Sequence, residues 1–600
     1  MESIVKAENV NFAYKTDDGE GNAIDRTALN GLSLSIAPGS YTAILGPNGS
    51  GKSTFAKLIN VLEVPSDGKV VVLGYDTKNE EGFWHIRENC ACVFQNPDNQ
   101  IVGTIVEEDV AFGPENLGVP LPELRERVDK ALADVGILDL AKRQAASLSG
   151  GQKQKLAIAG ALAMDPKVLI LDESTAMLDP NSRDEFLDVV ERLRKEKGLT
   201  LITITHDMTE AARCDYIYVI EKGQVSMQGK PADVFINEYK VNSASLELPV
   251  HIKLTYEIAK SLGQWLKPTQ IESTQSCVDT IIKMIQDSQI CKASAPRTKA
   301  IKKDPNVILE VSNLDFAYED NSNKILKNIN LKVYEGEVLA IVGKSGCGKT
   351  TLISHLNALY RPQTGDVKLN LKDKTLSASN KKHIIELRQN VGLVFQYPEY
   401  QLFEETVYKD IAFGLRKMGL TEEEQNERIN EAISAVGLDE ALLRESPFDL
   451  SGGQKRRVAM AGVLAMRPRV LVLDEPASGL DPKGRMDMFR MINNLRKAGT
   501  TIILVSHNMD EAAANADRIC CIKKGEIVAI DTPEELFKDS SKAKEMGIAV
   551  PKLYDFAGEV KAAIKEKWVS FTPESPKQTA EEEAEAILRA FIASKEGRNG

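Results

Sequence analysis

Two glycine-rich segments, GPNGSGKST at 46–54 and GKSGCGKTT at 343–351, place the strongest constraint on how this chain folds. Each follows an apolar, strand-like run and precedes a run of helix formers, so each predicts a strand, a loop and a helix in that order. The pattern G-x-x-x-x-G-K-[ST] turns backbone N–H groups around phosphate oxygens at a helix N-terminus. The sequence therefore predicts two phosphate-binding loops in one chain.

A second motif, LSGGQ, also occurs once in each half of the chain. Its serine follows the loop lysine by 97 residues in the first copy and by 102 in the second. An Asp–Glu pair begins 23 residues after the serine in both copies, and a histidine follows that Glu by 33 and 32 residues. The residues concerned are Lys52, Ser149, Asp172, Glu173 and His206, and Lys349, Ser451, Asp474, Glu475 and His507. Landmarks that keep this register indicate a gene duplication or fusion.

The bulk composition excludes several classes of protein. The 600 residues include 75 basic and 87 acidic side chains, a net charge of −12 that argues against a broad nucleic-acid-binding surface. No apolar run approaches the roughly 18–20 residues that cross a bilayer, and the first residues lack the pattern of a secretory signal. The eight cysteines form no paired C-x-x-C ligand sets, so reduced thiols are expected. We expect a soluble intracellular protein with at least two cores.

Both halves have the pattern of an α/β protein. VLILDE and VLVLDE are continuous apolar runs that suit a buried parallel strand, and LITITH and IILVSH suit its neighbours. The segments after the LSGGQ glycines carry good helix formers. After each core, a proline, a segment with helical period and a tryptophan predict a small helical extension. The last segment, EEEAEAILRAFIASKEGRNG, predicts an exposed helix with a frayed end.

These patterns divide the chain into five parts. The part between the halves is rich in Lys, Pro and Ala, which favours a solvated linker over the alternative of a nucleic-acid-binding tract. The expected parts are a first α/β domain (1–240), its helical extension (241–290), a linker (291–305), a second α/β domain (306–540) and its helical extension (541–600).

The phosphate loops predict a nucleoside triphosphate with Mg²⁺. Lys52 and Lys349 would reach the β- and γ-phosphates, and Ser53 and Thr350 would ligate Mg²⁺. The predicted nucleotide-binding residues of the loops are Gly46, Asn48, Gly49, Gly51, Lys52, Ser53 and Thr54, and Gly343, Ser345, Gly346, Gly348, Lys349, Thr350 and Thr351.

Polar residues that close apolar strands complete each predicted site. Asp172 and Asp474 would be costly to bury unpaired, so we expect them to hold Mg²⁺. The adjacent Glu173 and Glu475 suit a general base that polarises water. His206 and His507 end the next strand and are expected to contact the γ-phosphate and orient the site.

A glutamine and a tyrosine of each half each allow two interpretations. Gln95 and Gln396 suit a mobile loop that touches Mg²⁺ and the attacking water, although a turn with a polar surface residue gives the same pattern. Tyr14 and Tyr318 suit stacking on adenine, and ordinary strand aromatics are the alternative. Phe12 and Phe316, two residues earlier, are expected to face inward.

LSGGQ needs its glycines so that backbone can approach a phosphate, and its serine to donate a hydrogen bond. The motif lies far along the chain from the loop of its own half. A head-to-tail pairing would bring Ser451 and Gly453 onto the nucleotide held by Lys52, and Ser149 and Gly151 onto that held by Lys349.

Taken together, these motifs resemble the ATP-binding cassette (ABC) ATPases over nearly the whole chain. Aromatic loop, Walker A, Q-loop, signature, Walker B, D-loop (LDP at 178–180 and 480–482) and H-loop occur in order, twice. The resemblance implies two tandem P-loop ABC ATPase domains, each with a helical signature subdomain, an antiparallel β subdomain and a helical extension. It implies ATP and Mg²⁺ as ligands and ATP hydrolysis as the activity.

VFQNPDNQ and VFQYPEYQ, followed by VEEDVAFG and VYKDIAFG, resemble the ATPases of energy-coupling factor (ECF) transporters and of cobalt importers. This resemblance implies two fused ATPase subunits on the cytoplasmic face of the membrane, as a peripheral protein. The implied partners are an integral membrane coupling protein and a small substrate-binding membrane protein for vitamins or transition-metal ions. The Q-loop grooves, at 96–100 and 397–401, would receive the coupling protein.

Two local features carry further expectations. Ser174 replaces the proline that commonly follows the catalytic Glu, but because Glu173 remains, both sites are expected to hydrolyse ATP. Cys347 lies in the second phosphate loop at a helix N-terminus, which predicts a lowered thiol pKa and alkylation that ATP blocks.

The alternative function is a soluble tandem ABC ATPase that acts on ribosomes or nucleic acid. Translation factors of this kind would have a long charged helical arm between the halves. A ribosome-recycling enzyme of this kind would have cysteine clusters near the N-terminus. The segment between the halves is short and the first cysteine is Cys90. The sequence therefore favours transport, without nucleic acid as a partner.

Overall fold

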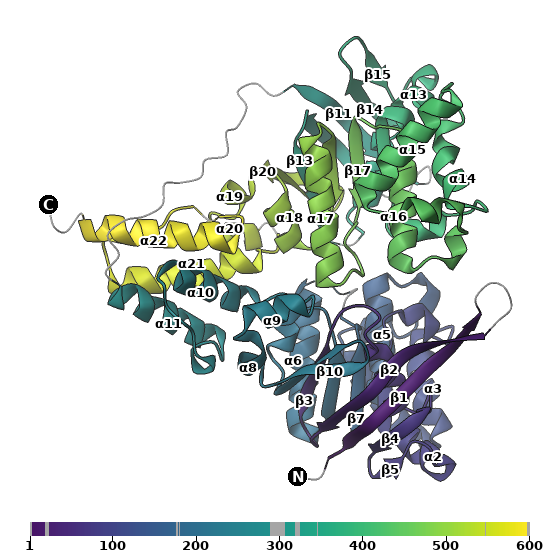
Figure 1. The fold of residues 1–600 in the computed structure, drawn as a ribbon, viewed down its shortest axis with the longest axis vertical. Helices are drawn as coiled ribbons and strands as arrows, with labels where there is room; N and C mark the ends of the chain where they lie inside the picture. The colour runs from purple at the N-terminus through teal and green to yellow at the C-terminus, as the bar shows by residue number, and fades with distance from the viewer. Residues whose placement is uncertain are drawn as a thin grey trace. The chain divides into compact units, whose positions relative to one another are not determined.

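The structure is a computed structural model (Figure 1). It describes residues 3–17, 23–175, 178, 180–288, 306–318, 324–344, 346–545, 548–575 and 577–596. Two compact units are Met1–Tyr256 with Trp265–Thr280 and Gly479–Lys483, and Glu257–Gln264 with Ile281–Ser478 and Gly484–Gly600. The expected linker lies outside the described residues, as does Ser345, and the expected domain boundaries stay a prediction.

The first half is built on a sheet of six strands in the order β10–β9–β3–β8–β7–β6. All neighbours are parallel except β10, which pairs antiparallel with β9 at one edge. The strands are β3 (Tyr41–Leu45), β6 (Cys90–Val93), β7 (Val168–Asp172), β8 (Thr200–Ile204), β9 (Tyr216–Glu221) and β10 (Gln224–Gly229). Strands β3, β7 and β8 are buried at every position, which explains their continuous apolar sequences.

A second, antiparallel sheet of the first half has the order β2–β1–β4–β5. Its strands are β1 (Val5–Asp17), β2 (Ala23–Ile36), β4 (Asp67–Val72) and β5 (Tyr75–Asp76). The long strands β1 and β2, in purple in Figure 1, run side by side. Between this sheet and β3 lies one apolar core that includes Phe12, Leu29, Ile44 and Phe55. Phe12 therefore faces inward, as predicted.

Helices of the first half flank these sheets. Helices α3, α4 and α5 pack on one another as a helical group, and α5 begins within the LSGGQ segment. The helices are α1 (Lys52–Ile59), α2 (Glu80–Asn89), α3 (Val106–Asn116), α4 (Leu121–Asp134), α5 (Gly150–Ala163), α6 (Pro180–Lys197), α7 (Met208–Ala211), α8 (Pro231–Phe235), α9 (Glu238–Ser243), α10 (Val250–Ser261) and α11 (Thr274–Asp287).

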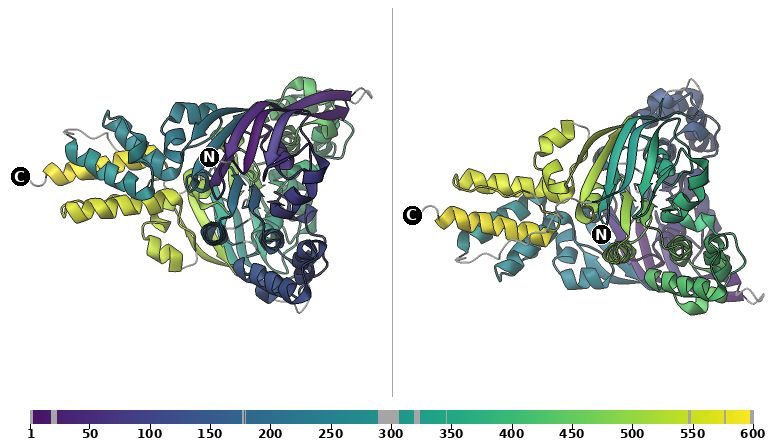
Figure 2. Two further views of the ribbon diagram at one scale, coloured as in Figure 1. Left: turned by 90° about the horizontal axis from the view of Figure 1, so that it is seen from below. Right: turned by 90° about the horizontal axis from the view of Figure 1, so that it is seen from above.

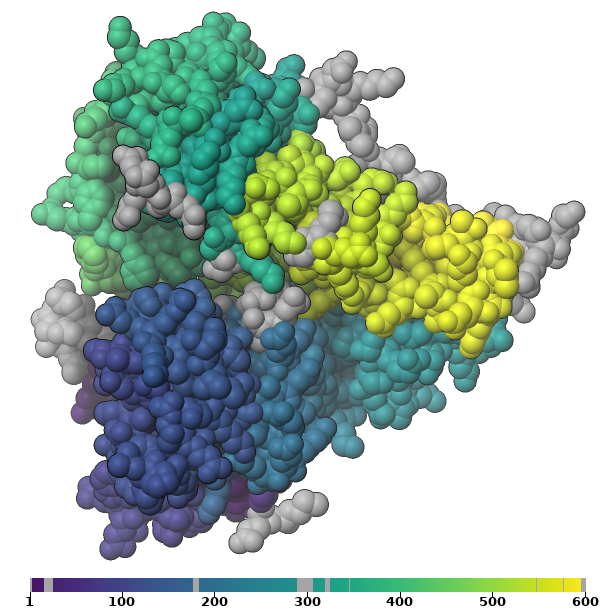
Figure 3. All heavy atoms as spheres, turned by 180° about the vertical axis from the view of Figure 1, so that it is seen from behind, coloured from purple at the N-terminus to yellow at the C-terminus, as the bar shows by residue number. Residues whose placement is uncertain are grey.

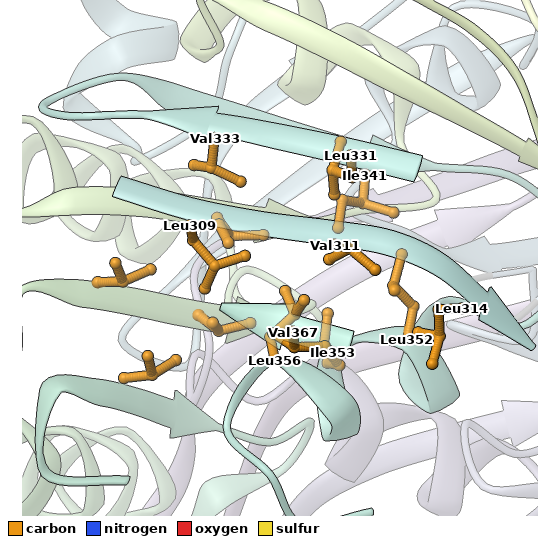
Figure 4. Packing of buried hydrophobic residues seen from close by; sticks show 14 of the residues in the cluster. Leu309, Val311, Leu314, Leu331, Val333, Ile341, Leu352, Ile353, Leu356 and Val367 are labelled. Carbon is orange, nitrogen blue, oxygen red and sulfur yellow. The ribbon is translucent and has the colours of Figure 1, made fainter. Parts of the chain in front are cut away.

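The second half repeats this plan, with a sheet ordered β16–β17–β18–β13–β19–β20 and an antiparallel sheet ordered β12–β11–β14–β15. Its strands are β11 (Val307–Phe316), β12 (Leu326–Tyr334), β13 (Val338–Val342), β14 (Thr364–Asn370), β15 (Thr375–Ser377), β16 (Val391–Val394), β17 (Val470–Asp474), β18 (Thr501–Val505), β19 (Arg518–Lys523) and β20 (Glu526–Asp531). Figure 4 shows Val311 of β11 and Val367 of β14 facing Ile353 in the core. The predicted α/β class is confirmed in both halves.

The helices of the second half follow the same order as those of the first. They are α12 (Lys349–Leu356), α13 (Ile384–Asn390), α14 (Val407–Ala412), α15 (Glu422–Val436), α16 (Gly452–Leu464), α17 (Pro482–Lys497), α18 (Met509–Asn515), α19 (Pro533–Leu536), α20 (Ser540–Glu545), α21 (Lys552–Lys567) and α22 (Ala580–Glu596). Short 3₁₀ turns follow the Q-loop glutamines, η1 (Pro97–Asn99) and η6 (Pro398–Gln401).

Unusual backbone conformations repeat with the sequence. Several non-glycine residues have positive φ angles, which L-residues adopt at a cost. Most of them occur in matching pairs, Asn9 and Asn313, Val61 and Ala358, Asp165 and Arg467, Glu173 and Glu475, and Lys222 and Lys524. The two halves thus share their turns as well as their motifs.

The predicted exposure of the last helix is wrong. Helices α21 and α22 run alongside each other in both views of Figure 2, and in Figure 3 the end of the chain (yellow) lies directly against the yellow-green part of the same unit. Ile587 and Phe591 of α22 are fully buried, and the Phe591 ring packs edge-on against Trp568. The segment is rich in charged residues, but its apolar residues recur at helical spacing and form a stripe that packs inward.

A buried ion pair joins the two helices of this extension. The fully buried Glu583 of α22 lies 2.5 Å from the Lys561 ammonium of α21 and accepts a hydrogen bond of 2.7 Å from the Lys577 N–H. Lys561 also donates to the Glu574 carbonyl at 3.1 Å. Because both charges are removed from water, each depends on the other for compensation.

We predict that Glu583→Ala destabilises the extension by about 3–5 kcal/mol, because Lys561 would be left buried without its counter-charge. Asp555→Ala is the matched control: its partner Lys544 is 3.2 Å away, but both side chains are about half exposed, and loss of such a pair costs at most about 1 kcal/mol. Urea unfolding followed by Trp568 fluorescence, with the other tryptophans replaced by phenylalanine, measures the difference. Equal stabilities of the two variants would contradict the prediction.

Candidate functional site

The first phosphate loop joins β3 to α1 and depends on glycine at its tightest positions. Gly46 has a φ of +142°, and a Cβ there would lie 2.1 Å from the Ile220 carbonyl oxygen. Gly51 caps α1 with a φ of 104°, and its Cβ would meet the Ala28 carbonyl at 2.5 Å. Gly343 and Gly348 repeat both conformations in the second loop. The loops therefore have room for backbone only, which suits a close approach to phosphate.

The lysine of each loop points its ammonium group into the loop itself. Lys52 is buried, and its Nζ donates to the carbonyl oxygens of Gly46 and Pro47 at 2.9 Å each. Lys349 donates in the same way to Gly343 at 2.8 Å and Lys344 at 3.2 Å. Burial lowers the pKa of Lys52. An ammonium ion held inside a ring of amides fits an anion such as a phosphate chain.

A hydroxyl and a carboxylate meet beside each loop. Ser53 Oγ donates to Asp172 Oδ1 at 3.1 Å, and Thr350 Oγ1 donates to Asp474 Oδ2 at 3.3 Å. Burial raises the pKa of Asp172 and of Asp474 to about 6. A hydroxyl, a carboxylate and a nearby amide oxygen are the oxygen ligands that Mg²⁺ prefers, so these residues fit that ion.

The next residue of each strand, Glu173 or Glu475, holds three segments together. Glu173 Oε2 accepts from Gln95 Nε2 at 2.6 Å, and its Oε1 lies 2.9 Å from His206 Nε2. Glu475 makes the same contacts with Gln396 at 2.7 Å and with His507 Nδ1 at 3.0 Å. The structure thus brings together the glutamate, glutamine and histidine that the sequence singled out.

The two glutamates share an uncommon environment. Their φ angles of 50° and 48° are left-handed, a conformation that costs roughly 1–3 kcal/mol and often marks a functional site. Burial acts to raise the pKa of Glu173, but the hydrogen bond and charge of His206 outweigh it, so the pKa is lowered. The pKa of Glu475 is lowered for the same reasons, through His507. Both side chains are therefore carboxylates at neutral pH.

The two sites differ at the histidine. His206 Nε2 also lies 3.1 Å from Asn48 Oδ1 of the phosphate loop, and its side chain is 9% exposed. His507 uses its other ring nitrogen and is 35% exposed. The residue that replaces Asn48 in the second loop is Ser345, which lies outside the described residues.

The predicted adenine-stacking tyrosines lie beside the helices that follow the loops. Tyr14 Oη is 3.3 Å from Thr54 Oγ1, and Tyr318 Oη is 2.9 Å from Thr351 Oγ1. Tyr318 is 58% exposed, so one ring face is open to a ligand. Phe316, in contrast, is buried, as predicted.

The signature serines cap helices. Ser149 Oγ accepts from the Gln152 N–H and Ser451 Oγ from the Gln454 N–H, each at 3.4 Å, at the start of α5 and α16. Ser451 Oγ also donates to Gln454 Oε1 at 2.7 Å. Both serines are exposed at a helix N-terminus, the end that attracts anions. Gly151 and Gly453 lie in the first turns, and the pairing of each signature with the loop of the other half stays a prediction.

The prediction of a reactive thiol at Cys347 is wrong. Cys347 is buried at 8% exposure, and this burial raises the pKa of its thiol in spite of the nearby Lys349 charge. Its side chain belongs to the apolar core under the second loop. Sequence position alone gave the helix N-terminus but not the direction in which the side chain points.

Several residues of the site region were not recognised in the sequence. Glu210 and Glu511 each follow the site histidine by four residues, and Asp109 and Asp410 tie the chain after each Q-loop to a helix. Their equal spacing in the two halves was the signal that could have identified them.

Comparison with known families agrees with this geometry. A family model described as "ABC transporter" matches residues 29–176 and 326–478, which include both phosphate loops and both signature motifs.

The chain belongs to the ABC transporter family. It has two tandem ABC ATPase domains and is an ATP-binding subunit of an ABC transporter with ATPase activity.

Three relatives show the range of similarity. An ABC transporter ATP-binding protein, provisionally so named, from Caldanaerobacter subterraneus subsp. tengcongensis is 34% identical over 93% of this chain and 96% of its own length. A Bacillus subtilis protein provisionally named HMP/thiamine import ATP-binding protein YkoD is 31% identical over 93% of this chain and 96% of its own length. The energy-coupling factor transporter ATP-binding protein EcfA1 of Clostridium perfringens is 48% identical over 43% of this chain and 91% of its own length.

Within the described part of the chain, every helix is too short or too polar to span a bilayer.

We predict that Cys347 resists thiol reagents in the native protein, because its raised pKa keeps the thiolate scarce at neutral pH. The measurement is the rate of reaction with a chromogenic disulfide in a Cys291→Ser chain, since Cys291 lies outside the described residues. Urea-unfolded protein gives the reference rate, and Cys347→Ser identifies the signal. A fast reaction of Cys347 in the native protein that ATP suppresses would contradict this prediction and would indicate a reactive thiol.

Proposed function

We propose that this chain is the ATP-hydrolysing subunit of an ECF-type importer, with ATP and Mg²⁺ bound at each phosphate loop. The observation that carries the catalytic part is the cluster of carboxylate, imidazole and amide around Glu173 and around Glu475. The membrane part is supported by exposed apolar side chains beside each Q-loop and by similarity to EcfA1.

The contacts of each site support the following proposed roles. The loop amides and Lys52 would bind the phosphates, while Ser53, Asp172 and Gln95 would hold Mg²⁺, which would neutralise phosphate charge. Glu173, kept ionised by His206, accepts a proton from the attacking water. His206, already in contact with Asn48 of the loop, contacts the γ-phosphate.

Lys349, Thr350, Asp474, Glu475, Gln396 and His507 take the same roles in the second site. We further propose that Ser451 and Gly453 close over the ATP at Lys52, and Ser149 and Gly151 over the ATP at Lys349. Closure on ATP and release after hydrolysis then drive the membrane partner.

The proposed partner surface lies just after each Q-loop. Asp109 Oδ1 accepts from the N–H groups of Val102 and Gly103 at 2.7 Å each, which fixes the loop against α3. Two apolar side chains of this segment are exposed, Val102 at 66% and Phe112 of α3 at 50%. Apolar groups exposed in the same place in both halves suit a protein contact.

The second half presents the same surface with larger side chains. Asp410 Oδ2 accepts from the N–H groups of Phe403 and Glu404 at 3.0 Å each. Phe403 and Phe413 are 57% and 50% exposed, and their rings meet edge-on at 4.9 Å. We propose that these two surfaces, with the Q-loop grooves at 96–100 and 397–401, receive an integral membrane coupling protein that works with a small substrate-binding membrane protein.

The proposed localisation is the cytoplasmic face of the membrane, as a peripheral subunit. The similarity to YkoD, whose name gives HMP/thiamine import, supports uptake of a vitamin, and a transition-metal ion is the other substrate class that we propose. The soluble alternative, work on ribosomes or nucleic acid, has no matching feature among the described residues, and the net charge of −12 argues against it.

We predict that Glu173→Gln and Glu475→Gln each lower ATP turnover, and that the double variant loses about 10²-fold or more, because each removes a general base. Steady-state ATPase rates of the full chain measure this, with the exposed Glu126→Gln and Glu422→Gln as controls. If one single variant kept the full rate, its site would be regulatory rather than hydrolytic.

We also predict that the chain co-purifies with integral membrane proteins in mild detergent, and that Phe403→Ala/Phe413→Ala weakens this association. Mass spectrometry of the purified complex identifies the partners. Val569→Ala, which alters an 82% exposed side chain of the C-terminal extension, is the control. Sedimentation with ribosomes instead of membranes would favour the soluble alternative.

A further inference from the structure

A glutamate with no part in the proposed chemistry lies four residues beyond each site histidine. Glu210 on α7 is 2% exposed, and the side chain of Glu511 on α18 is 16% exposed. A carboxylate so far removed from water is costly unless the protein supplies it with partners. The two halves supply those partners in different ways.

In the first half, three hydroxyl groups donate to Glu210. Thr203 Oγ1 lies 2.5 Å from Oε1, while Thr205 Oγ1 and Thr175 Oγ1 each lie 3.0 Å from Oε2. Thr175 follows Glu173 by two residues, and Thr205 directly precedes His206. Glu210 therefore ties the chain that leaves β7, after the catalytic glutamate, to the chain that leaves β8, at the histidine.

The hydroxyl of Thr205 makes a second contact that spans the histidine. It accepts a hydrogen bond of 3.0 Å from the N–H of Asp207 while it donates to Glu210. The residues before and after His206 are thus fixed to one another and to a buried carboxylate. We call this arrangement the bracket, defined as Thr205 with Glu210 in the first half and Ser506 with Glu511 in the second.

The second half contains the same bracket. Ser506 Oγ accepts from the N–H of Asn508 at 3.0 Å, and its hydroxyl lies 3.3 Å from Glu511 Oε2 and 3.2 Å from the Asn508 carbonyl oxygen, so the two acceptors share one proton. His507 is enclosed between these contacts as His206 is in the first half.

The remaining partners of the glutamate have changed. Ala477 and Leu504 stand where the first half has Thr175 and Thr203, so two hydroxyl donors are lost. Arg485 compensates, with its Nε 3.4 Å from Glu511 Oε1.

The matching arginine of the first half, Arg183, lies 2.5 Å from Asp207, whose place in the second half is taken by Asn508. The arginine therefore pairs with Asp207 in the first half and with Glu511 in the second. The glutamate and the hydroxyl next to the histidine are what both halves retain.

We propose that the bracket sets the position of the site histidine against the catalytic glutamate, so that Thr205, Glu210, Ser506 and Glu511 are positioning residues for ATP hydrolysis. The inference rests on the proposed roles of His206 and His507. A flexible turn would let the imidazole leave Glu173 and the phosphate loop, and misplacement by about 1 Å can cost up to about 10²-fold in rate.

The test compares two double variants of the full chain. Thr205→Val/Ser506→Ala removes both hydroxyls with little change in side-chain volume. Thr205→Ser/Ser506→Thr exchanges them between the halves, keeps both hydrogen bonds and is the matched control. We expect the first to lower kcat for ATP roughly tenfold or more, with KM changed less than about threefold because the phosphate loop is untouched. The exchange variant should stay within about twofold of the native rate.

A spectroscopic readout separates positioning from stability. The ¹⁵N shifts of the His206 and His507 imidazoles, assigned with histidine substitutions, should move in the hydroxyl-free variant and stay native in the exchange variant. Glu210→Gln, which preserves volume, serves if the hydroxyl-free variant folds poorly. A native kcat and native histidine shifts in folded hydroxyl-free protein would overturn the proposal.

His206→Ala/His507→Ala distinguishes failure of the bracket from failure of the proposed function. If this variant keeps the native kcat, the role given to the histidines is wrong. If it loses turnover while the hydroxyl-free variant does not, the histidine role stands and the bracket alone is refuted.

Discussion

Each site depends on a contact between the ends of two neighbouring buried strands. β7 ends at Asp172, directly before Glu173, and β8 ends at Ile204, two residues before His206; β17 and β18 repeat this with Glu475 and His507. Parallel pairing puts both ends at one edge of the sheet, and a left-handed φ at each glutamate turns its side chain onto the imidazole. The strands are buried at every position and mostly apolar, so the polar groups of the site lie where the strands end.

Much of this was predictable from the sequence, because the constraints are local. The glycines of the phosphate loop, the apolar strands and the Asp–Glu pair each report on a few neighbouring residues, and their order identified two α/β halves of ABC type. The direction of single side chains was not predictable. Cys347 faces the core rather than the loop, and α22 buries an apolar stripe beneath its charged residues. Such outcomes depend on tertiary packing, which a helix-terminus rule or a charge count does not contain.

Because the chain is duplicated, its two halves can be compared with each other. The glutamine–glutamate–histidine contacts occur in both halves although the residues around them differ. Other contacts have changed partner between the halves. On the signature helix α5, Gln154 reaches the Phe94 carbonyl, whereas its counterpart Arg456 on α16 reaches Glu399 of the second Q-loop and the Ser478 carbonyl. Both halves connect the Q-loop to the signature helix through charge, since Lys153 of α5 lies 2.6 Å from Asp98 in the first half, but at this position the first half uses an amide and the second an arginine.

The capping of the signature helices has a consequence for how a phosphate would be captured. Ser149 Oγ accepts a hydrogen bond from the Gln152 N–H, and within the described residues its own hydroxyl donates to no acceptor. Ser451 has already given its proton to Gln454 Oε1. If a γ-phosphate bound there as proposed, it would compete with that amide for the hydroxyl of Ser451, but not for the hydroxyl of Ser149. The hydroxyl proton of Ser451 is therefore engaged by its capping glutamine, whereas that of Ser149 is not, although both glutamines accept a hydrogen bond from the serine N–H.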